Sequence, residues 1–298
     1  MRAIVLHNPD AGNGDVAADE LLAALAGGGV TAVRYCSTRQ PDFAQALGEP
    51  ADLIVVAGGD GTVIKVVPHL RGRTLPIAIL PLGGANNVAR SLGITGDPLE
   101  IARGGWQGSD RRRLDIGAAR GPWGRRLFIE AVGLGALAEA AAAIDKSGVS
   151  GPDKSELARR ALCETVAAAQ PQEVRLTIDG QEVGLRCLLA EIMNLAATGP
   201  KLLLAPAADP GDGLLDLVYL EPEARADMLA WLEAPAEGVP PLVTRRGRGF
   251  TFEWRQGQLR VGDTFPSPPA SPCTVAVELL PEAVTVLAPR APIPGGIE

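Results

Sequence analysis

The chain has 298 residues and 46% apolar residues, so it is long enough for two domains and too apolar to be disordered. A net charge of −7, no basic tail and only 4% aromatic residues argue against a nucleic-acid partner. Two histidines and four scattered cysteines argue against a His-based metal site or a disulfide framework. A strand pattern starts near the N-terminus without a signal peptide, and no apolar run reaches the roughly 18 residues of a membrane span. We therefore expect a cytoplasmic protein.

Strands alternate with helices over the first 110 residues. Apolar runs predict strands at residues 3–6, 30–35, 53–57 and 77–80, and helix patterns are centred on Leu21–Leu25 and on residues 63–70 and 85–92. Pro41 and Asp42 are expected to open a further short helix. Runs that are apolar on both faces are typical of the central strands of a parallel sheet. The pattern predicts an α/β, Rossmann-like nucleotide-binding domain over residues 1–110.

The pattern changes after residue 110. Short strands are predicted at residues 114–116, 174–178, 185–192, 214–219, 250–254 and 274–279, with helices at residues 136–144 and 155–169. This predicts a second, mainly antiparallel β-sandwich domain over residues 111–279. The three arginines at positions 111–113 are interpreted as a solvated turn before a strand or, alternatively, as a contact for a phosphate or an anionic lipid, and the tail after Pro289 as loosely ordered.

Residues 58–62 read Gly-Gly-Asp-Gly-Thr and connect a buried strand to a helix. Glycines in such a connection let backbone N–H groups approach phosphates, and a helix N-terminus favours an anion. Asp60 would then hold Mg²⁺ or take a proton from an acceptor hydroxyl. Thr62 would donate to a phosphate or cap the helix. The alternative is a tight turn whose glycines supply positive φ.

Three further segments accompany this loop: residues 8–14 (Asn-Pro-Asp-Ala-Gly-Asn-Gly), residues 81–90, and residues 205–216 with their Asp-Gly-Leu-Leu-Asp end. In this order, the four segments resemble the diacylglycerol kinase catalytic family and its sphingosine kinase and bacterial lipid kinase relatives, in the NAD kinase-like superfamily. The resemblance covers most of the chain.

The resemblance implies a catalytic cleft between the two domains, with the chain end, about residues 280–298, returning to the first domain. It implies ATP and Mg²⁺ as cofactors and transfer of the γ-phosphate to a lipid hydroxyl such as that of diacylglycerol. The lipid would be met at the membrane surface, so we expect a protein peripheral at the inner membrane face. The sequence leaves a homodimer open.

The resemblance also implies site residues. The nucleotide contacts fall on loop residues, namely Asn8, Ser37, Thr38, Gly58, Gly59, Asp60, Gly61, Thr62, Gly84 and Asn87. A structural Mg²⁺ would be held by the Asp212 side chain and by backbone oxygens near Asp209 and Leu214. Asp115 matches an acidic position that organises this metal network, or is a turn partner at a strand edge.

Several positions depart from the family pattern. Ile64 and Lys65 stand where relatives carry Asn-Glu, Gly84 stands for a phosphate-binding threonine, and Asn87 for an aspartate that faces metal. The late Asp-Gly-Glu, whose glutamate is the general base in bacterial members, has its best counterpart in Gly262-Asp263-Thr264. Asp263 and Asp60 are therefore the candidate catalytic residues.

Three other functions remain open. The departures are compatible with a catalytically weak or inactive kinase-fold protein that binds nucleotide or lipid in a regulatory role. Residues 12–17 match the G-x-G-x-x-A fingerprint of dinucleotide-binding oxidoreductases, although no acidic residue ends the next strand. NAD kinases share the Gly-Gly-Asp-Gly-Thr loop, although the Asn-Pro opening favours the lipid branch.

Overall fold

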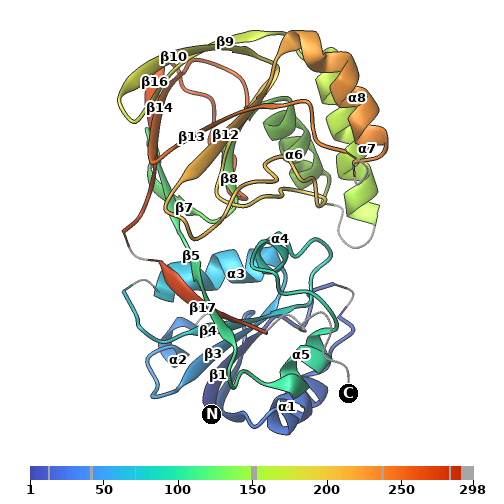
Figure 1. Cartoon of the computed structure of the whole chain (residues 1–298), viewed down its shortest axis with the longest axis vertical. Helices are drawn as coiled ribbons and strands as arrows, with labels where there is room; N and C mark the ends of the chain where they lie inside the picture. The colour runs from blue at the N-terminus through green and yellow to red at the C-terminus, as the bar shows by residue number, and fades with distance from the viewer. Residues whose placement is uncertain are drawn as a thin grey trace, which may run out of the picture. The chain divides into compact units, whose positions relative to one another are not determined.

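The computed structural model describes residues 1–12, 14–40, 43–70, 72–148, 153–235, 238–281 and 283–289. The expectations for Asn13, Pro41, Asp42 and the tail after Pro289 lie outside the described residues. The chain forms two compact units, Met1–Leu114 with Val284–Glu298, and Asp115–Ala283. The predicted fold class, an α/β unit with a parallel sheet and a mainly antiparallel β unit, is confirmed (Figure 1).

The first unit is built on one six-stranded sheet with the order β2-β1-β3-β4-β17-β5. All neighbouring pairs are parallel except β17 and β5, which pair antiparallel. The strands are β1 (Arg2–His7), β2 (Thr31–Ser37), β3 (Leu53–Gly58), β4 (Ile77–Pro81), β5 (Asp110–Leu114) and β17 (Val284–Ala288). The carboxyl ends of β1 to β4 therefore lie along one edge of the sheet, which is where α/β folds bind ligands.

Helices cover this sheet. They are α1 (Ala18–Gly27), α2 (Phe43–Ala46), α3 (Asp60–Val66), the 3₁₀ turn η1 (Val67–Leu70), α4 (Asn87–Ser91) and α5 (Pro98–Gly104). Side chains of α1 and α5, including Leu21 and Ala102, share a core with Val5 and Val55. The alternate strand residues, such as Ile54, are also fully buried, so both faces of the sheet are covered.

Two predicted helices of this unit are present with other bounds, and one predicted turn is wrong. The helix expected at residues 63–70 starts at Asp60 and tightens into 3₁₀ geometry from Val67. The helix expected at residues 85–92 is the single turn Asn87–Ser91. The arginines at 111–113 do not form a turn but lie within β5, because their backbones pair with Thr285–Leu287 of β17.

The second unit contains two antiparallel sheets, with the orders β10-β9-β14-β16-β6-β7 and β13-β12-β11-β8-β15. The first sheet is formed by β6 (Gly117–Gly121), β7 (Gly124–Phe128), β9 (Gln172–Ile178), β10 (Gln181–Cys187), β14 (Gly249–Trp254) and β16 (Cys273–Leu279). The second is formed by β8 (Ala131–Gly135), β11 (Leu189–Met193), β12 (Leu215–Leu220), β13 (Val243–Gly247) and β15 (Leu259–Val261).

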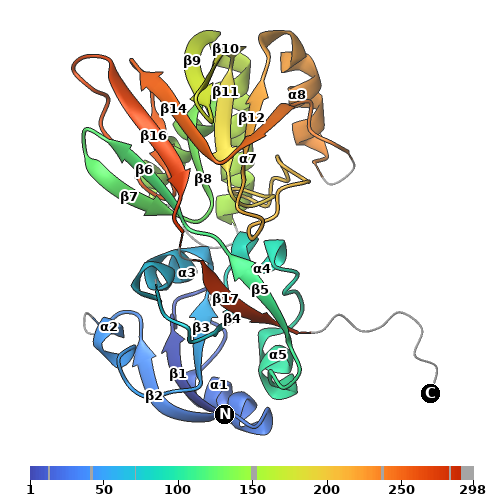
Figure 2. The same cartoon turned by 60° about the vertical axis from the view of Figure 1, so that its left-hand side comes forward.

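The five-stranded sheet is covered on both faces. One core joins it to the six-stranded sheet and includes Val132, Leu217, Phe250 and Val277. A second core packs its other face against α6 (Ala136–Ser147), α7 (Asp153–Ala168) and α8 (Arg225–Glu233), with the 3₁₀ turn η2 (Pro222–Ala224) before α8. Figure 1 labels all three helices, and Figure 2 shows α7 and α8 from another side. Alanine-rich α6 and α7 thus supply core side chains. The prediction missed β6, β7 and β8 because these strands are short and rich in glycine and arginine.

Candidate functional site

The loops at the carboxyl ends of β1, β2, β3 and β4 surround a cavity of about 450 Å³ in the first unit. The cavity is lined by Asn8, Ala11, Gly12, Thr38, Arg39, Gly59, Gly61, Thr62, Lys65 and Gly83. Each of the four strands contributes residues of the loop that follows it. A parallel sheet thereby gathers onto one edge four segments that are far apart in the sequence.

Five of the ten residues predicted to contact a nucleotide line this cavity: Asn8, Thr38, Gly59, Gly61 and Thr62. The other five lie in or beside the same loops without lining it: Ser37, Gly58, Asp60, Gly84 and Asn87. The cationic side chains of Arg39 and Lys65 also line the cavity, although neither was named as a site residue. The sequence could have indicated Lys65, because it lies one helical turn after Gly61 and therefore on the same face of the predicted helix.

Gly58 and Gly59 are required for close approach, a Cβ on Gly61 would meet no heavy atom within 4 Å, and none of the three has a positive φ. A Cβ on Gly58 would lie 2.3 Å from Thr62 Oγ1, and one on Gly83 would lie 2.6 Å from Gly59 Cα. Gly59 has φ −89° and ψ −172°, an extended conformation that any residue adopts. The interpretation of this segment as a turn with positive-φ glycines is therefore wrong.

Thr62 is buried in the first turn of α3, where its hydroxyl accepts a hydrogen bond of 3.3 Å from Asn8 Nδ2. The N-cap residue of this helix is Gly59, whose carbonyl accepts the Thr62 backbone N–H at 2.9 Å. The alternative in which Thr62 caps the helix is therefore wrong. Its hydroxyl instead connects the loops that follow β1 and β3.

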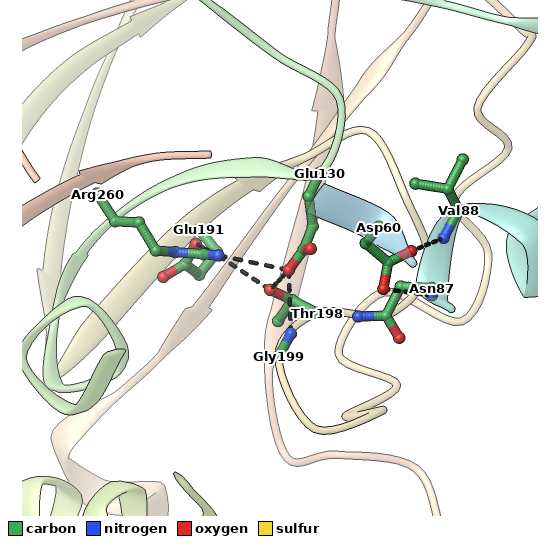
Figure 3. Close-up of polar contacts among 8 residues, drawn as sticks. All are labelled: Asp60, Asn87, Val88, Glu130, Glu191, Thr198, Gly199 and Arg260. Carbon is green, nitrogen blue, oxygen red and sulfur yellow. Dashed lines mark hydrogen bonds and ion pairs between the residues drawn. The ribbon is translucent and has the colours of Figure 1, made fainter. Parts of the chain in front are cut away.

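Asp60 ties α3 to α4. Its two carboxylate oxygens accept the backbone N–H groups of Asn87 and Val88, each at 2.9 Å (Figure 3). These N–H groups belong to the first turn of α4, where no partner within the helix exists. A carboxylate that accepts two backbone hydrogen bonds is held in one orientation. Asp60 therefore stabilises the packing of the loop after β3 against the loop after β4.

Positive charge gathers at one side of the cavity. Lys65 Nζ donates to the Thr38 carbonyl at 2.6 Å and lies 4.8 Å from the centroid of the Phe43 ring. Arg39 Nε donates to Asp10 Oδ2 at 2.6 Å, and this bond lowers the pKa of the Asp10 carboxyl. The Ser37 hydroxyl accepts the Arg39 backbone N–H at 3.3 Å and so shapes the same turn. The cavity wall is suited to a phosphorylated ligand.

In the second unit, the four residues of the predicted metal set lie together. Asp115 is fully buried, and its Oδ2 accepts the Gly213 backbone N–H at 2.9 Å while its own N–H donates to the Pro210 carbonyl at 2.7 Å. Asp115 thereby holds the loop that contains Asp209, Asp212 and Leu214, and serves as its turn partner.

The carboxylates of this loop are already engaged with protein donors. Asp209 Oδ1 accepts the Gly211 N–H at 3.0 Å, and Asp212 Oδ1 accepts the Leu214 N–H at 2.9 Å. The second oxygen of Asp212 contacts the guanidinium of Arg246. Within the part of the chain that the structure describes, no three His, Cys, Asp or Glu residues are grouped so as to hold a metal ion. A cation beside Arg246 does not fit this donor set, because the two positive charges would repel.

A buried ionic cluster, which the sequence analysis missed, lies between β8, β11 and β15 (Figure 3). Arg260 Nη2 lies 2.9 Å from Glu191 Oε2 and 3.0 Å from Thr198 Oγ1. Arg260 Nη1 lies 3.4 Å from Glu130 Oε1, which also accepts the Gly199 backbone N–H at 3.0 Å and the Thr198 hydroxyl.

All four residues of this cluster are at most 5% exposed. Burial raises the pKa of the Glu191 carboxyl, and Arg260 opposes that shift. The signal in the sequence was a charged residue within an otherwise apolar strand run, in Phe-Ile-Glu-Ala-Val and in Leu-Ala-Glu-Ile-Met. Such residues are almost never buried unless they are paired.

Asp263 lies directly after β15 in a tight turn. The backbones of Val261 and Thr264 pair across this turn, and Gly262 has φ +55° and donates to the Ala131 carbonyl at 2.9 Å. The Asp263 side chain is exposed. Even so, desolvation by nearby protein atoms and then the Glu130 charge raise the pKa of its carboxyl, while Arg260 lowers it.

Two family models match the chain. Residues 2–119 match the diacylglycerol kinase catalytic domain, and residues 130–288 match the YegS C-terminal NAD kinase beta sandwich-like domain. The two matches together cover most of both units.

Individual proteins resemble the chain over most of their length. A diacylglycerol kinase of Mycobacterium tuberculosis is 26% identical over 97% of this chain and 96% of its own. A Pseudomonas aeruginosa protein named "Probable lipid kinase YegS-like" is 32% identical over 81% of this chain and 80% of its own. The crystal structure of a diacylglycerol kinase from Bacillus anthracis superposes with a TM-score of 0.70 at 19% identity, covering 98% of each chain. That of yeast NADH kinase has a TM-score of 0.54 at 9% identity, covering 97% of this chain and 84% of its own.

Proposed function

Because the chain belongs to the diacylglycerol kinase and YegS-like lipid kinase family, and is thus a lipid kinase, we propose that it transfers the γ-phosphate of MgATP to a hydroxyl of a glycerolipid such as diacylglycerol. The observation that carries this proposal is the cavity at the carboxyl ends of β1 to β4. Its volume is in the range of small-molecule sites.

The cavity wall supports ATP as the ligand. Gly59 and Gly61 present backbone without side chains, and the Asn8 amide and Thr62 hydroxyl add polar groups. Lys65 and Arg39 supply the cations that phosphates require. Bound to the nucleotide, Mg²⁺ would neutralise phosphate charge during transfer.

We assign the general base to Asp263. The acceptor hydroxyl oxygen bonds to the γ-phosphorus as the bond between that phosphorus and the β,γ-bridging oxygen breaks, and ADP leaves. The hydroxyl proton passes to the Asp263 carboxylate. A carboxylate whose pKa is raised is a stronger base than an ordinary aspartate. Asp60 is the weaker candidate because both of its oxygens already accept backbone N–H groups.

The lipid acceptor would be met at the membrane surface. None of the described helices is long and apolar enough to cross a bilayer. Because the proposed acceptor is a lipid, we propose a reaction at the surface of a membrane or micelle, in which the diacylglycerol hydroxyl reaches the enzyme from the interface.

The test is transfer of labelled γ-phosphate from ATP, with Mg²⁺, to diacylglycerol, monoacylglycerol or sphingosine in mixed micelles, with NAD as a soluble acceptor. We expect labelled phosphatidic acid from diacylglycerol. Lys65→Met should raise KM for ATP at least tenfold, because a contact with a charged group is worth about 1.5–3 kcal/mol. Lys146→Met, the same change on α6 of the second unit, should leave KM unchanged.

Asp263→Asn should lower kcat by about 10²-fold or more while ATP still binds. Labelling of NAD alone would reassign the chain to a nucleotide acceptor. ATP binding without labelling of any acceptor would support the regulatory alternative and overturn the proposal.

A further inference from the structure

The loop that precedes β12, together with the start of that strand, carries Asp209, Asp212 and Asp216 within eight residues. Asp216 is the second residue of β12, and its register partner on β13 is Arg246. Arg246 Nε lies 3.1 Å from Asp216 Oδ1, and Nη2 of the same guanidinium contacts Asp212 Oδ2. One guanidinium therefore bridges two carboxylates.

Two carboxylates placed this close together would be unfavourable without a positive charge between them. Asp216 is 2% exposed, and burial raises the pKa of its carboxyl, with the neighbouring Asp212 charge acting in the same direction. Arg246 opposes both effects. An arginine stays charged at every pH at which the protein folds, and its planar fork suits two acceptors at once.

Oxygen-rich loops of this kind are suited to a hard divalent cation. Here the geometry points to another solution. We propose that Arg246 takes the place of a bound divalent cation at residues 209–216, so that the fold of this loop is independent of Mg²⁺. The position follows from strand pairing, because the β12–β13 register sets Arg246 opposite Asp216.

The remaining acceptors of the loop support this assignment. Asp209, Asp212 and Asp115 each use one carboxylate oxygen for a backbone N–H of the loop itself. Together with Arg246, these bonds close the turns of the loop through protein donors. The proposal concerns the folded state of the second unit and does not depend on the proposed kinase reaction.

The test measures thermal unfolding of the full chain without nucleotide, in excess EDTA and in excess MgCl₂. We expect the same unfolding midpoint for the native chain in both conditions. Arg246→Gln should lower the midpoint by several degrees in EDTA, because two carboxylates lose their shared partner. Arg245→Gln, a neighbouring exposed arginine on β13, is the matched control and should leave the midpoint unchanged.

A saturable rise of the native midpoint with MgCl₂ that Asp212→Asn abolishes would overturn the proposal. An Arg246→Gln midpoint equal to that of Arg245→Gln would overturn it too. If Arg246→Gln fails to fold, binding of Mn²⁺ to the native chain is measured by electron paramagnetic resonance instead. Bound Mn²⁺ that is lost in Asp212→Asn contradicts the proposal, and its absence supports it.

Discussion

Gly59 and Gly83 approach each other so closely that a Cβ on Gly83 would lie 2.6 Å from the Cα of Gly59. The two residues follow adjacent parallel strands, and the Asn86 side chain fixes the second loop by accepting the Gly83 N–H at 2.9 Å and donating to its carbonyl at 2.6 Å. This contact sets the spacing of the two loops beside the cavity.

Gly83→Ala should therefore separate the two loops. The added methyl group meets backbone, which cannot rotate away, so we expect a loss of about 1–3 kcal/mol in the free energy of unfolding and a higher KM for ATP. Gly84→Ala is the control, because a Cβ there has no heavy atom within 4 Å. Denaturant unfolding and ATP kinetics check both. Equal behaviour of the two variants would show that the close approach is not required.

Gly84 offers a gain of function. The family resemblance implies a phosphate-binding threonine in relatives at this position, and the chain has open space there without a positive φ. Gly84→Thr should lower KM for ATP about tenfold, as expected for one new hydrogen bond to a charged phosphate. Gly84→Val has the same shape without the hydroxyl and should leave KM unchanged. Identical KM values for the threonine and valine variants would contradict a hydroxyl contact.

Asp60→Asn should act mainly on stability. An asparagine side chain has one acceptor oxygen, so one of the N–H groups of Asn87 and Val88 loses its partner. We expect a loss of about 1–3 kcal/mol in the free energy of unfolding, together with weaker ATP binding. A variant of unchanged stability whose kcat falls about 10²-fold would instead assign the proton transfer to Asp60.

The parallel sheet was predictable because β1, β3 and β4 are apolar on both faces and each ends in a glycine- or asparagine-rich turn. Local glycine spacing also identified the loop at residues 58–62. It did not reveal why the glycines are needed, since Gly83 approaches Gly59 only after β3 and β4 pair.

The features that the sequence did not reveal depend on long-range pairing. Arg260 meets Glu130 and Glu191 only because β8 pairs with both β11 and β15. Likewise, Arg246 meets Asp216 through the β12–β13 register. A single sequence carries the charges but not the register that brings them together.

The pH dependence of the reaction should report the surroundings of Asp263. Its pKa is raised, so a base at this position loses activity at a higher pH than an ordinary aspartate as the pH falls. Glu130 and Asp145 raise this pKa, and Arg260 and Lys154 lower it.

Glu130→Gln removes one negative charge, so the acidic limb of the kcat/KM profile should move to lower pH. Glu139→Gln, an exposed change on α6, should not move it. A limb that moves upward in Glu130→Gln, or stays in place, would contradict the assignment of Asp263.

Gly133→Ala should be among the most destabilising single substitutions in the second unit. A Cβ at this position would lie 1.9 Å from Glu191 Oε1, and the Glu191 carboxylate cannot move away because it is fully buried and bound to Arg260. Displacing it breaks a buried ion pair, which costs about 3–5 kcal/mol.

The double-mutant cycle with Glu191→Ala separates this steric cause from a general effect on β8, because the methyl group then enters the space that the carboxylate leaves. We expect Gly133→Ala to cost less in the Glu191→Ala background, with a coupling of at least about 1 kcal/mol by denaturant unfolding. If the effects of the two substitutions on the free energy of unfolding add, the methyl group destabilises β8 itself and its contact with Glu191 is not the cause.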